Sequence, residues 1–316
     1  AERVPNTYPA TDYTSHTPIL FILYINDVTD ILVDDVSCKL YADDLKLYCP
    51  IVPTLGFSES LQTSLDNLCD WSLKWQLPIN VDKSFFVTIS RNNICNCVHS
   101  YRILCSLLTR RFSVDDLGIA YDCNLCFDNY VNNIASSAKA KVGLLFRSFK
   151  TRDPALLKRA YVTYIRPKLE YASNLWNPFH KTTIAVLENV QRYFTRRIPS
   201  LSIFSYEERL AMLNLDTLEK RRLKSDLVLY YKILHGLSSI PASAFDTYNT
   251  CSVSRSKSSL LRKNIAGTQA CYFSFFNRAV DCWNVLPSSL TDASSLSVFR
   301  SRLDMTDLSH YCTVLA

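Results

Sequence analysis

The alternation of apolar and polar residues on both sides of Asp43 and Asp44 predicts a short β-hairpin over residues 37–48. Aspartate tolerates left-handed backbone, so we expect the two acids to form a two-residue turn. In that register the apolar pairs across the hairpin are Ala42 with Leu45 and Leu40 with Leu47. Leu40 and Leu47 would pack on the preceding helix, and the two carboxylates would lie at the tip.

The segment before the hairpin is continuously apolar from Ile19 to Ile25. Thr17 can cap a helix and Pro18 suits its first position, so we expect a helix from here to about residues 30–32. Its near-continuous apolar character predicts that it is buried under a sheet. After the hairpin, leucines at helical spacing predict a second helix near residues 58–76.

Two later segments of the N-terminal part are expected to be extended. Residues 85–89 are aromatic and β-branched and predict a strand. Residues 110–128 alternate around Leu117 and Gly118, a pattern typical of extended chain. Gly118 would allow a ligand to approach the backbone closely.

From residue 128 the pattern becomes helical. Apolar residues recur at helical spacing over 134–149, 184–198 and 223–234, with cap signals at Asp153-Pro154, Ser205-Tyr206-Glu207-Glu208 and His235-Gly236. Four or five amphipathic helices with short loops predict a bundle over 128–236. A Ser-rich linker is expected at 237–270, and aromatic residues return in a C-terminal extension over 271–316. The fold class is therefore predicted to be α+β.

Composition limits the class of protein. The chain has 316 residues, of which 48% are hydrophobic and 20% charged, as in an ordinary globular protein. The longest apolar run is too short to span a bilayer, and no cleavable signal is visible. Twelve cysteines without such a signal are expected to be reduced thiols, which favours an intracellular location, nuclear or cytoplasmic.

Charge is divided along the chain. Residues 1–138 hold 16 acidic and 9 basic residues, whereas residues 139–232 hold 8 acidic and 19 basic residues. Arg192, Arg196 and Arg197 share one side of the 182–198 helix, and a later helix carries Arg221, Arg222 and Lys224. Such side chains bind phosphates without sequence preference, although a solvated face is the plain alternative.

The acid pair also has two interpretations. Mg²⁺ is held by one or two carboxylates together with substrate phosphates, so Asp43 and Asp44 could bind Mg²⁺. The alternative is a solvated acidic turn without a metal ion, which would have the same sequence. The neighbouring segments favour the Mg²⁺ site over this alternative.

Several segments, taken in order, resemble one family. They are Pro18–Asp27, Tyr41-Ala42-Asp43-Asp44, Arg166–Ser173, Trp176-Asn177-Pro178, Phe275–Arg278 and Trp283-Asn284. Together they resemble the reverse transcriptases of non-LTR (LINE-type, jockey-like) retrotransposons. The resemblance implies a partial palm with a small antiparallel sheet over 1–127, a helical thumb over 128–236 and a helical C-terminal extension.

The resemblance also implies chemistry. Asp43 and Asp44 would be catalytic carboxylates that hold Mg²⁺ or Mn²⁺, and Lys83 would lie near the nucleotide triphosphate. Leu117 and Gly118 would belong to the hairpin that grips the primer strand. The implied partners are an RNA template and a DNA primer duplex, without a membrane.

The chain departs from the family pattern near its start. Val4-Pro5 resembles part of the template-positioning loop, but the Gln and Gly that follow in the family are missing. No residue corresponds to the first catalytic aspartate of the family. We therefore expect a reverse-transcriptase fragment that lacks activity alone; the alternative is a non-catalytic nucleic-acid-binding remnant.

Overall fold

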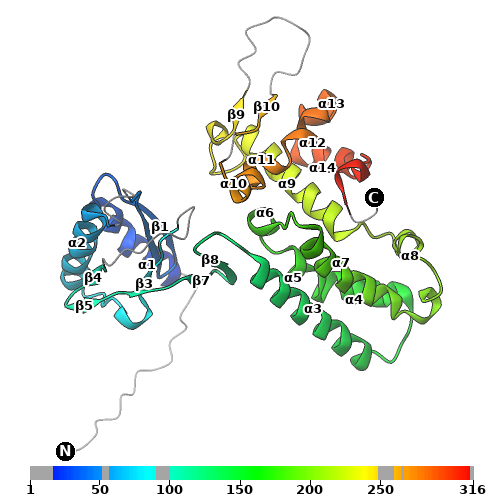
Figure 1. Cartoon of the computed structure of the whole chain (residues 1–316), viewed down its shortest axis with the longest axis horizontal. Coiled ribbons are helices and arrows are strands. Elements are labelled where there is room, and N and C mark those ends of the chain that lie inside the picture. The colour runs from blue at the N-terminus through cyan, green and yellow to red at the C-terminus, as the bar shows by residue number, and fades with distance from the viewer. Residues whose placement is uncertain (1–16, 52–56, 90–99, 248–259, 265–266, 314–316) are drawn as a thin grey trace, which may run out of the picture. The chain divides into compact units, whose positions relative to one another are not determined.

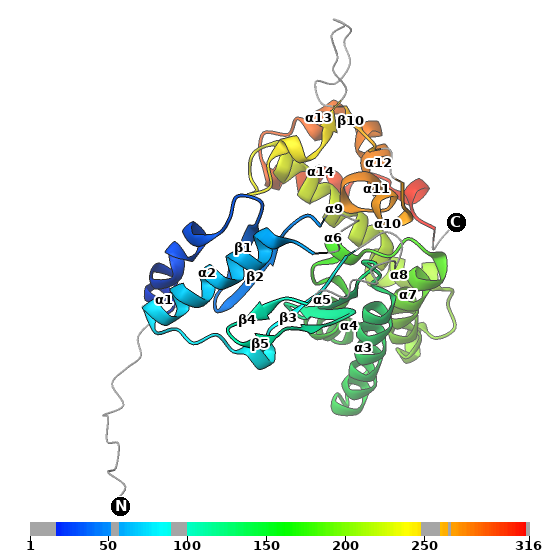
Figure 2. The same ribbon diagram turned by 60° about the vertical axis from the view of Figure 1, so that its left-hand side comes forward.

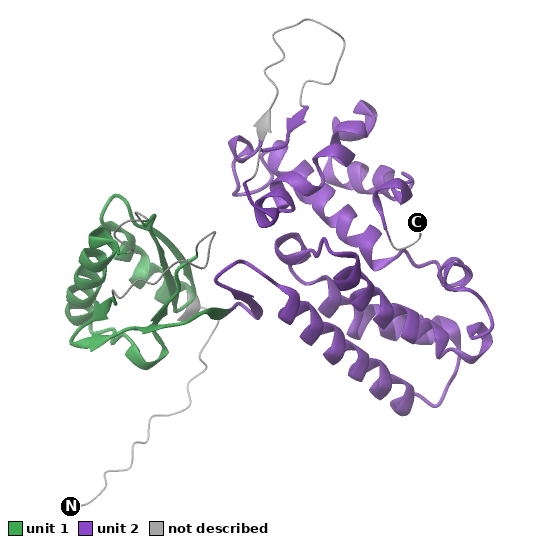
Figure 3. Cartoon of the chain, viewed as in Figure 1, with its two compact units in different colours: residues 1–114 green, residues 115–316 purple. Residues whose placement is uncertain are grey.

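The computed structural model describes residues 17–51, 57–89, 100–247, 260–264 and 267–313 (Figure 1). It divides the chain into two compact units, which we call unit 1 (residues 1–114) and unit 2 (residues 115–316) (Figure 3). The Val4-Pro5 motif and part of the expected 237–270 linker lie outside the described residues.

Unit 1 combines helices with short strands. Its helical elements are α1 (Thr17–Ile25), the 3-10 helix η1 (Asn26–Ile31), α2 (Glu59–Trp75) and the 3-10 helix η2 (Val81–Lys83). Its strands are β1 (Ser37–Tyr41), β2 (Asp44–Tyr48), β3 (Phe85–Phe86), β4 (Arg102–Ile103), β5 (Ser106–Leu107) and β6 (Thr109–Arg110). β1 pairs with β2 and β4 with β5 in antiparallel fashion, whereas β3 and β6 are parallel.

Helix α2 organises the core of unit 1. Ser58 caps it by accepting a hydrogen bond from the Leu61 amide, as the sequence predicted for a helix near 58–76. One side of α2 buries Leu65 and Cys69 in a cluster with Tyr101, Ile103 and Leu108. Another side buries Leu68 and Trp71 against Ile25 and Val28.

The expected burial of the first helix is wrong for most of its residues. Ile19, Leu20, Ile22 and Leu23 are 55–67% exposed, whereas Ile25 is buried. The helix also changes to 3-10 geometry at Asn26 instead of continuing to residues 30–32. Its apolar residues surround the whole helix, so their pattern could not show that only the side towards α2 is covered.

Unit 2 is mainly helical, and the chain enters it along β7 (Ser113–Asp116), which pairs with β8 (Ile119–Asp122). The helices up to residue 234 are α3 (Asp128–Ser148), α4 (Pro154–Tyr164), α5 (Arg166–Glu170), α6 (Ser173–Trp176), α7 (Lys181–Arg196), η3 (Pro199–Leu201), α8 (Tyr206–Leu213) and α9 (Leu218–Leu234). Helices α3 and α7 lie side by side (Figure 2). The predicted α+β class with a helical C-terminal region is confirmed.

The remainder of unit 2 is built from short elements. They are η4 (Ala242–Ala244), β9 (Asp246–Thr247), β10 (Leu261–Arg262), α10 (Gln269–Tyr272), α11 (Phe275–Arg278), α12 (Val280–Val285), α13 (Ser288–Thr291), α14 (Leu296–Asp304) and η5 (Ser309–Tyr311). Across both units, no helix among the described residues is long and apolar enough to cross a membrane.

Local signals set the helix ends of unit 2. Asp153 accepts a 2.8 Å hydrogen bond from the Leu156 amide at the start of α4. Ser205 and Glu208 form both halves of the predicted capping box at α8. Gly236 adopts a φ of +68° after α9, a conformation that glycine reaches at little cost.

Helix α9 belongs to two cores. Its first residue, Leu218, is buried in the cluster that α3, α4 and α7 form. Further along, Leu227 and Tyr230 are buried in a second cluster with Trp283 and Phe299 of the C-terminal helices. Because α9 supplies both clusters, the predicted thumb-like region and C-terminal extension lie in one compact unit.

A buried ion pair ties these parts together. Asp226 on α9 is 1% exposed, and its carboxylate accepts hydrogen bonds from Arg278 Nη2 at 2.7 Å and Arg278 Nε at 2.8 Å. Asn174 Nδ2 donates to the same carboxylate at 2.9 Å, and its carbonyl accepts from Arg278 at 2.6 Å. The pair therefore joins α6, α9 and α11.

We predict that Arg278→Met lowers the free energy of unfolding of unit 2 by about 3–5 kcal/mol, because it leaves the buried Asp226 charge uncompensated. The measurement is urea unfolding followed by far-UV circular dichroism, which is dominated by the helical unit. Lys263→Met is the matched control: Lys263 pairs with Asp281, whose side chain is 66% exposed, so its loss should cost less than about 1 kcal/mol. Equal losses in the two variants would contradict a special role for the buried pair.

Candidate functional site

The hairpin that carries the acid pair is confirmed, but its register differs from the expected one. Tyr41 lies opposite Asp44, Leu40 opposite Leu45 and Cys38 opposite Leu47. The turn is therefore formed by Ala42 and Asp43, not by Asp43 and Asp44. Both registers place the apolar residues on one face, because they differ by a slip of two, so alternation alone could not choose between them.

Ala42 adopts a φ of +52°, and Asp43 does not share this left-handed conformation. A positive φ at only the first central residue is the signature of a type II′ turn, where glycine is usual. The alanine is thus held in a conformation that costs an L-residue about 1 kcal/mol or more. This conformation places Asp43 in the turn and makes Asp44 the first residue of β2.

Both carboxylates are exposed to solvent. Asp44 shares its face of the hairpin with Tyr41, away from the apolar face. On that apolar face, Leu45 packs against the cluster of Ile25, Val28 and Trp71, and Leu47 against the cluster around Leu65. Leu40 is 37% exposed, so the expectation that Leu40 and Leu47 pack on the first helix is wrong: Leu45 takes that place.

The acid pair does not by itself form a two-metal centre. Such a centre fixes two ions by carboxylates that converge from different parts of the chain. Among the described residues, no group of three or more His, Cys, Asp or Glu side chains could hold a metal ion. Asp27 on η1 instead accepts a 3.1 Å hydrogen bond from Trp71 Nε1. Two carboxylates can still contribute to one Mg²⁺ that substrate phosphates complete.

The other residues predicted for this site lie on separate elements. Lys83 ends η2 and is exposed, and it forms no ion pair with Asp43 or Asp44. Leu117 and Gly118 form the turn between β7 and β8, with φ values of +50° and +79°. Tyr171 donates a 3.2 Å hydrogen bond to the Leu117 carbonyl. No described atom lies within 4 Å of the position that a Cβ would take at Gly118. A glycine is favoured at this position because of its left-handed backbone, and not because a neighbouring atom leaves no room for a side chain.

The three arginines predicted on one side of α7 are exposed together. The Arg192 guanidinium lies 4.7 Å from the centre of the Tyr206 ring. Arg197 lies 4.9 Å from the centre of the Phe146 ring, and its Nη1 donates to the Tyr193 hydroxyl at 2.6 Å. We call Arg192, Arg196 and Arg197 the α7 arginines. Contact with aromatic rings restricts the motion of Arg192 and Arg197.

Arg209 of α8 adds a fourth guanidinium that the sequence analysis missed. It is 7% exposed, and its Nε donates to Thr195 Oγ1 at 3.1 Å. Burial lowers the pKa of Arg209, and the charges of Arg196 and Arg192 lower it further. Positive charge is therefore concentrated where α7 meets α8. The only signal in the sequence was a basic residue inside the short amphipathic helix.

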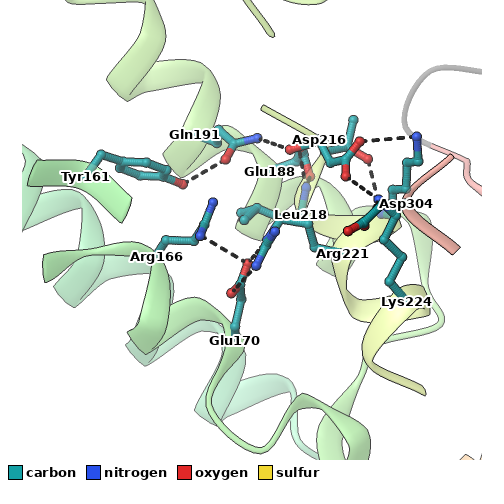
Figure 4. A network of polar contacts seen from close by, with 12 residues as sticks. Tyr161, Arg166, Glu170, Glu188, Gln191, Asp216, Leu218, Arg221, Lys224 and Asp304 are labelled. Carbon is teal, nitrogen blue, oxygen red and sulfur yellow. Dashed lines mark hydrogen bonds and ion pairs between the residues drawn. The ribbon is translucent and has the colours of Figure 1, made fainter. Parts of the chain in front are cut away.

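The cations of α9, which were predicted to bind phosphates with a solvated face as the alternative, are instead ion-paired or buried. Arg221 Nη2 donates to Glu170 Oε2 at 3.0 Å, and Lys224 Nζ contacts both Asp216 and Asp304 at 2.8 Å (Figure 4). Arg222 is only 1% exposed. The helix turns these three side chains towards acidic partners and the core, because α9 is covered on several sides by its neighbours.

A buried carboxylate network supports the α7–α8 corner. Glu188 of α7 is fully buried and accepts hydrogen bonds from the Tyr206 hydroxyl and, at 3.0 Å, from the Leu218 amide that begins α9 (Figure 4). Gln191 joins the same network by donating to Tyr206 at 3.1 Å. Burial raises the pKa of Glu188, while the hydrogen bonds from Tyr206 and Leu218 oppose the shift.

Comparison with known proteins places these features in context. An uncharacterised protein of Caenorhabditis elegans is 32% identical over 126 residues, which are 39% of this chain and 64% of that protein. The RNA-directed DNA polymerase from mobile element jockey of Drosophila funebris is 25% identical over 176 residues, 55% of this chain and 19% of the polymerase. Its Drosophila melanogaster counterpart is 26% identical over 193 residues, 60% of this chain and 20% of the polymerase.

The chain is related to the jockey polymerases. It spans about a fifth of their length and less than two thirds of the nematode protein. No family model matches the chain, and no solved structure matches it. The predicted resemblance to a non-LTR reverse transcriptase is thus confirmed at the level of distant sequence relationship, and the roles of individual residues stay predictions.

We predict that Tyr206→Phe destabilises unit 2 by about 1–3 kcal/mol, because it removes the hydroxyl that donates to buried Glu188. A carboxyl whose folded pKa is raised contributes stability below its unfolded pKa, and that contribution is lost as the pH rises through the folded pKa. Without the donor the pKa of Glu188 should rise further, so the loss should be larger at pH 8 than at pH 5. Urea unfolding at both values measures it.

Tyr193→Phe is the control for this experiment. It removes the same atom from a half-buried ring whose hydroxyl accepts from exposed Arg197, and it leaves Glu188 unchanged. Its cost should be below about 1 kcal/mol and independent of pH. A pH-independent loss in Tyr206→Phe would mean that Glu188 is not the group that the hydroxyl stabilises.

Proposed function

We propose that this chain is part of a non-LTR-type reverse transcriptase, in which unit 2 binds nucleic acid and the hairpin of unit 1 contributes Asp43 and Asp44 to a Mg²⁺-dependent site. The observation that carries the proposal is the hairpin itself: two adjacent carboxylates are exposed at a strained turn, in a chain related to the jockey polymerases. Mg²⁺ or Mn²⁺ would supply charge stabilisation for nucleotidyl transfer.

The residues of this chain would have separate tasks. Asp43 and Asp44 would hold the ion, and the exposed Lys83 would meet the phosphates of the incoming nucleotide. The turn at Leu117 and Gly118 would contact the primer strand through its open backbone. The partners would be an RNA template and its DNA primer duplex.

The α7 arginines support the nucleic-acid part of the proposal. Three exposed guanidiniums on one helix, with Arg209 behind them, concentrate positive charge on one surface of unit 2. Phosphate contacts by such side chains provide affinity without base recognition, and counterion release makes that affinity depend on salt. The cations of α9 are not part of this surface, since Arg221 and Lys224 are ion-paired and Arg222 is buried.

A second candidate function is nucleic-acid binding without catalysis. It is favoured by the absence, among the described residues, of any third metal-ligating side chain grouped with the acid pair. This candidate keeps the α7 arginines as the contact surface and assigns Asp43 and Asp44 no reaction. The two candidates differ in what this chain does when primer, template and nucleotide are supplied.

We predict that the chain binds an RNA–DNA duplex with little sequence preference and a log–log salt slope near −5, if about six phosphates are contacted. Replacing Arg192, Arg196 and Arg197 by Gln should make the slope less steep by about two to three units. Fluorescence anisotropy at several salt concentrations measures the slope.

The matched control removes three exposed cations outside α7, namely Lys74, Arg102 and Arg302. This variant changes the net charge equally and should leave the slope within about one unit of the wild-type value. Similar effects in both variants would indicate binding through net charge alone. An unchanged slope in the α7 variant would place the nucleic acid on another surface.

We predict no primer extension by this chain with Mg²⁺ or Mn²⁺. Asp44 shares its strand face with Tyr41 while Asp43 lies in the turn, so one hairpin cannot fix two ions against both the nucleophile and the triphosphate. A gel assay with an annealed primer and an RNA template tests this. Primer extension by the wild-type chain that is lost in Asp43→Asn would show that the metal site is complete, and would refute the prediction.

A further inference from the structure

A pocket of about 380 Å³ opens on unit 2 beside α9, and its wall is unusually rich in charge. The basic side chains in the wall are Arg221, Arg222, Lys224 and Arg300, and the acidic ones are Glu170 and Asp304. Four cations against two carboxylates give the wall a net charge of +2. Neither the similarity to the jockey polymerases nor the α7 arginines accounts for this pocket.

The two carboxylates are already occupied. Glu170 accepts both guanidinium hydrogen bonds of Arg221, and Asp304 accepts from Lys224 at 2.8 Å. This pairing leaves Arg222 and Arg300 as the cations that form no ion pair with another residue of the wall. Arg300 is exposed on α14 and forms no ion pair within the part of the chain that the structure describes.

Arg222 is the less usual of the two. It is 1% exposed, and its Nε donates to Asn177 Oδ1 at 2.8 Å. Its Nη1 and Nη2 atoms have no acceptor among the described residues. Buried guanidinium groups are ordinarily paired, because removing the charge from water is costly. An arginine left in this state therefore requires an explanation.

The carboxylates nearest to Arg222 cannot provide that explanation, because each has other partners. Asp226 is bound by Arg278 and Asn174, and Glu188 accepts from Tyr206 and Leu218. Glu219 accepts from the amide and hydroxyl of Thr313. The charges of Glu188, Glu219 and Asp226 still attract Arg222, but none of these carboxylates accepts a hydrogen bond from its two Nη atoms.

We propose that this pocket binds a small oxyanion of the phosphate class. Arg300 supplies donors at the wall, and the buried Arg222 supplies two guanidinium nitrogens that lack an acceptor among the described residues. The volume exceeds that of one phosphate group and lies within the range of small-ligand pockets. Phosphate could therefore arrive free, on a nucleotide, or within a nucleic-acid backbone.

The test is isothermal titration calorimetry of the full chain with inorganic phosphate and pyrophosphate, with chloride keeping the ionic strength constant. We expect saturable binding at one site. Arg300→Gln should weaken it about tenfold, the effect of losing one charge-assisted hydrogen bond. Arg147→Gln, which removes an equally exposed arginine from α3, should leave it unchanged. Arg222→Met should abolish it in a chain whose circular dichroism is unaltered.

If Arg222→Met fails to fold, the comparison of Arg300→Gln with Arg147→Gln decides. No saturable binding at millimolar phosphate, or equal weakening in these two variants, would overturn the proposal. Phosphate binding that is weakened only in the triple α7 variant would also overturn the proposal, because the anion would then bind the α7 arginines. That last variant also separates this proposal from nucleic-acid binding through the α7 arginines, which does not involve Arg300.

Competition identifies the source of the phosphate. A duplex without terminal phosphates that displaces bound pyrophosphate in the wild type and in the α7 variant would assign the pocket to a backbone phosphate. Displacement by a nucleoside triphosphate but not by the duplex would assign it to a free nucleotide. Both results support the pocket, because each requires the ligand to share the site that Arg300→Gln weakens.

Discussion

The ion pair between Asp226 and Arg278 is the contact on which unit 2 depends. It is buried, bidentate and completed by Asn174, so it meets the conditions under which two charges can be taken out of water. It also joins segments far apart in the chain, since Asn174 belongs to α6, Asp226 to α9 and Arg278 to α11. Two motifs that resemble non-LTR reverse transcriptases, around Trp176 and over Phe275–Arg278, thus meet at one structural contact. Their residue types are explained by packing before any catalytic role is considered.

The same contact accounts for the unusual state of Arg222. Asp226 lies one helical turn further along α9 and would be its natural partner, but the fork of Arg278 already occupies that carboxylate. Arg222 is left with one amide oxygen, from Asn177, while the core still encloses it. The two guanidinium nitrogens of Arg222 that lack an acceptor within the described parts of the chain are therefore a consequence of how unit 2 is held together. A pocket that binds an anion would return part of the cost of burying that charge.

The sequence predicted those features that depend on near neighbours along the chain. The caps at Asp153 and Ser205 each require only a side chain and an amide three residues later, and both are present. The predictions from sequence were wrong where the outcome depends on contacts with residues far away in the chain. The spacing of Arg221, Arg222 and Lys224 cannot reveal that Glu170 and Asp304 arrive from other helices. Likewise, a run that is apolar all round, such as Ile19–Ile25, does not say which side is covered. The predicted hairpin register was wrong for a third reason. Two registers place the same apolar residues on one face, so the alternation of apolar and polar residues fits both equally well.

The two candidate sites differ in how far their side chains are held in place. Two of the α7 arginines lie over aromatic rings, Arg192 over Tyr206 and Arg197 over Phe146 and Tyr193. Much of the entropy of ordering these two side chains is therefore lost before a ligand arrives. Asp43 and Asp44 have no comparable support: both are exposed, and one lies in a turn that a strained alanine shapes. Contact with phosphates therefore requires little rearrangement in unit 2, whereas metal binding in unit 1 requires ligands beyond the acid pair. Under the proposed function, the described residues are therefore better prepared for nucleic-acid binding than for metal binding.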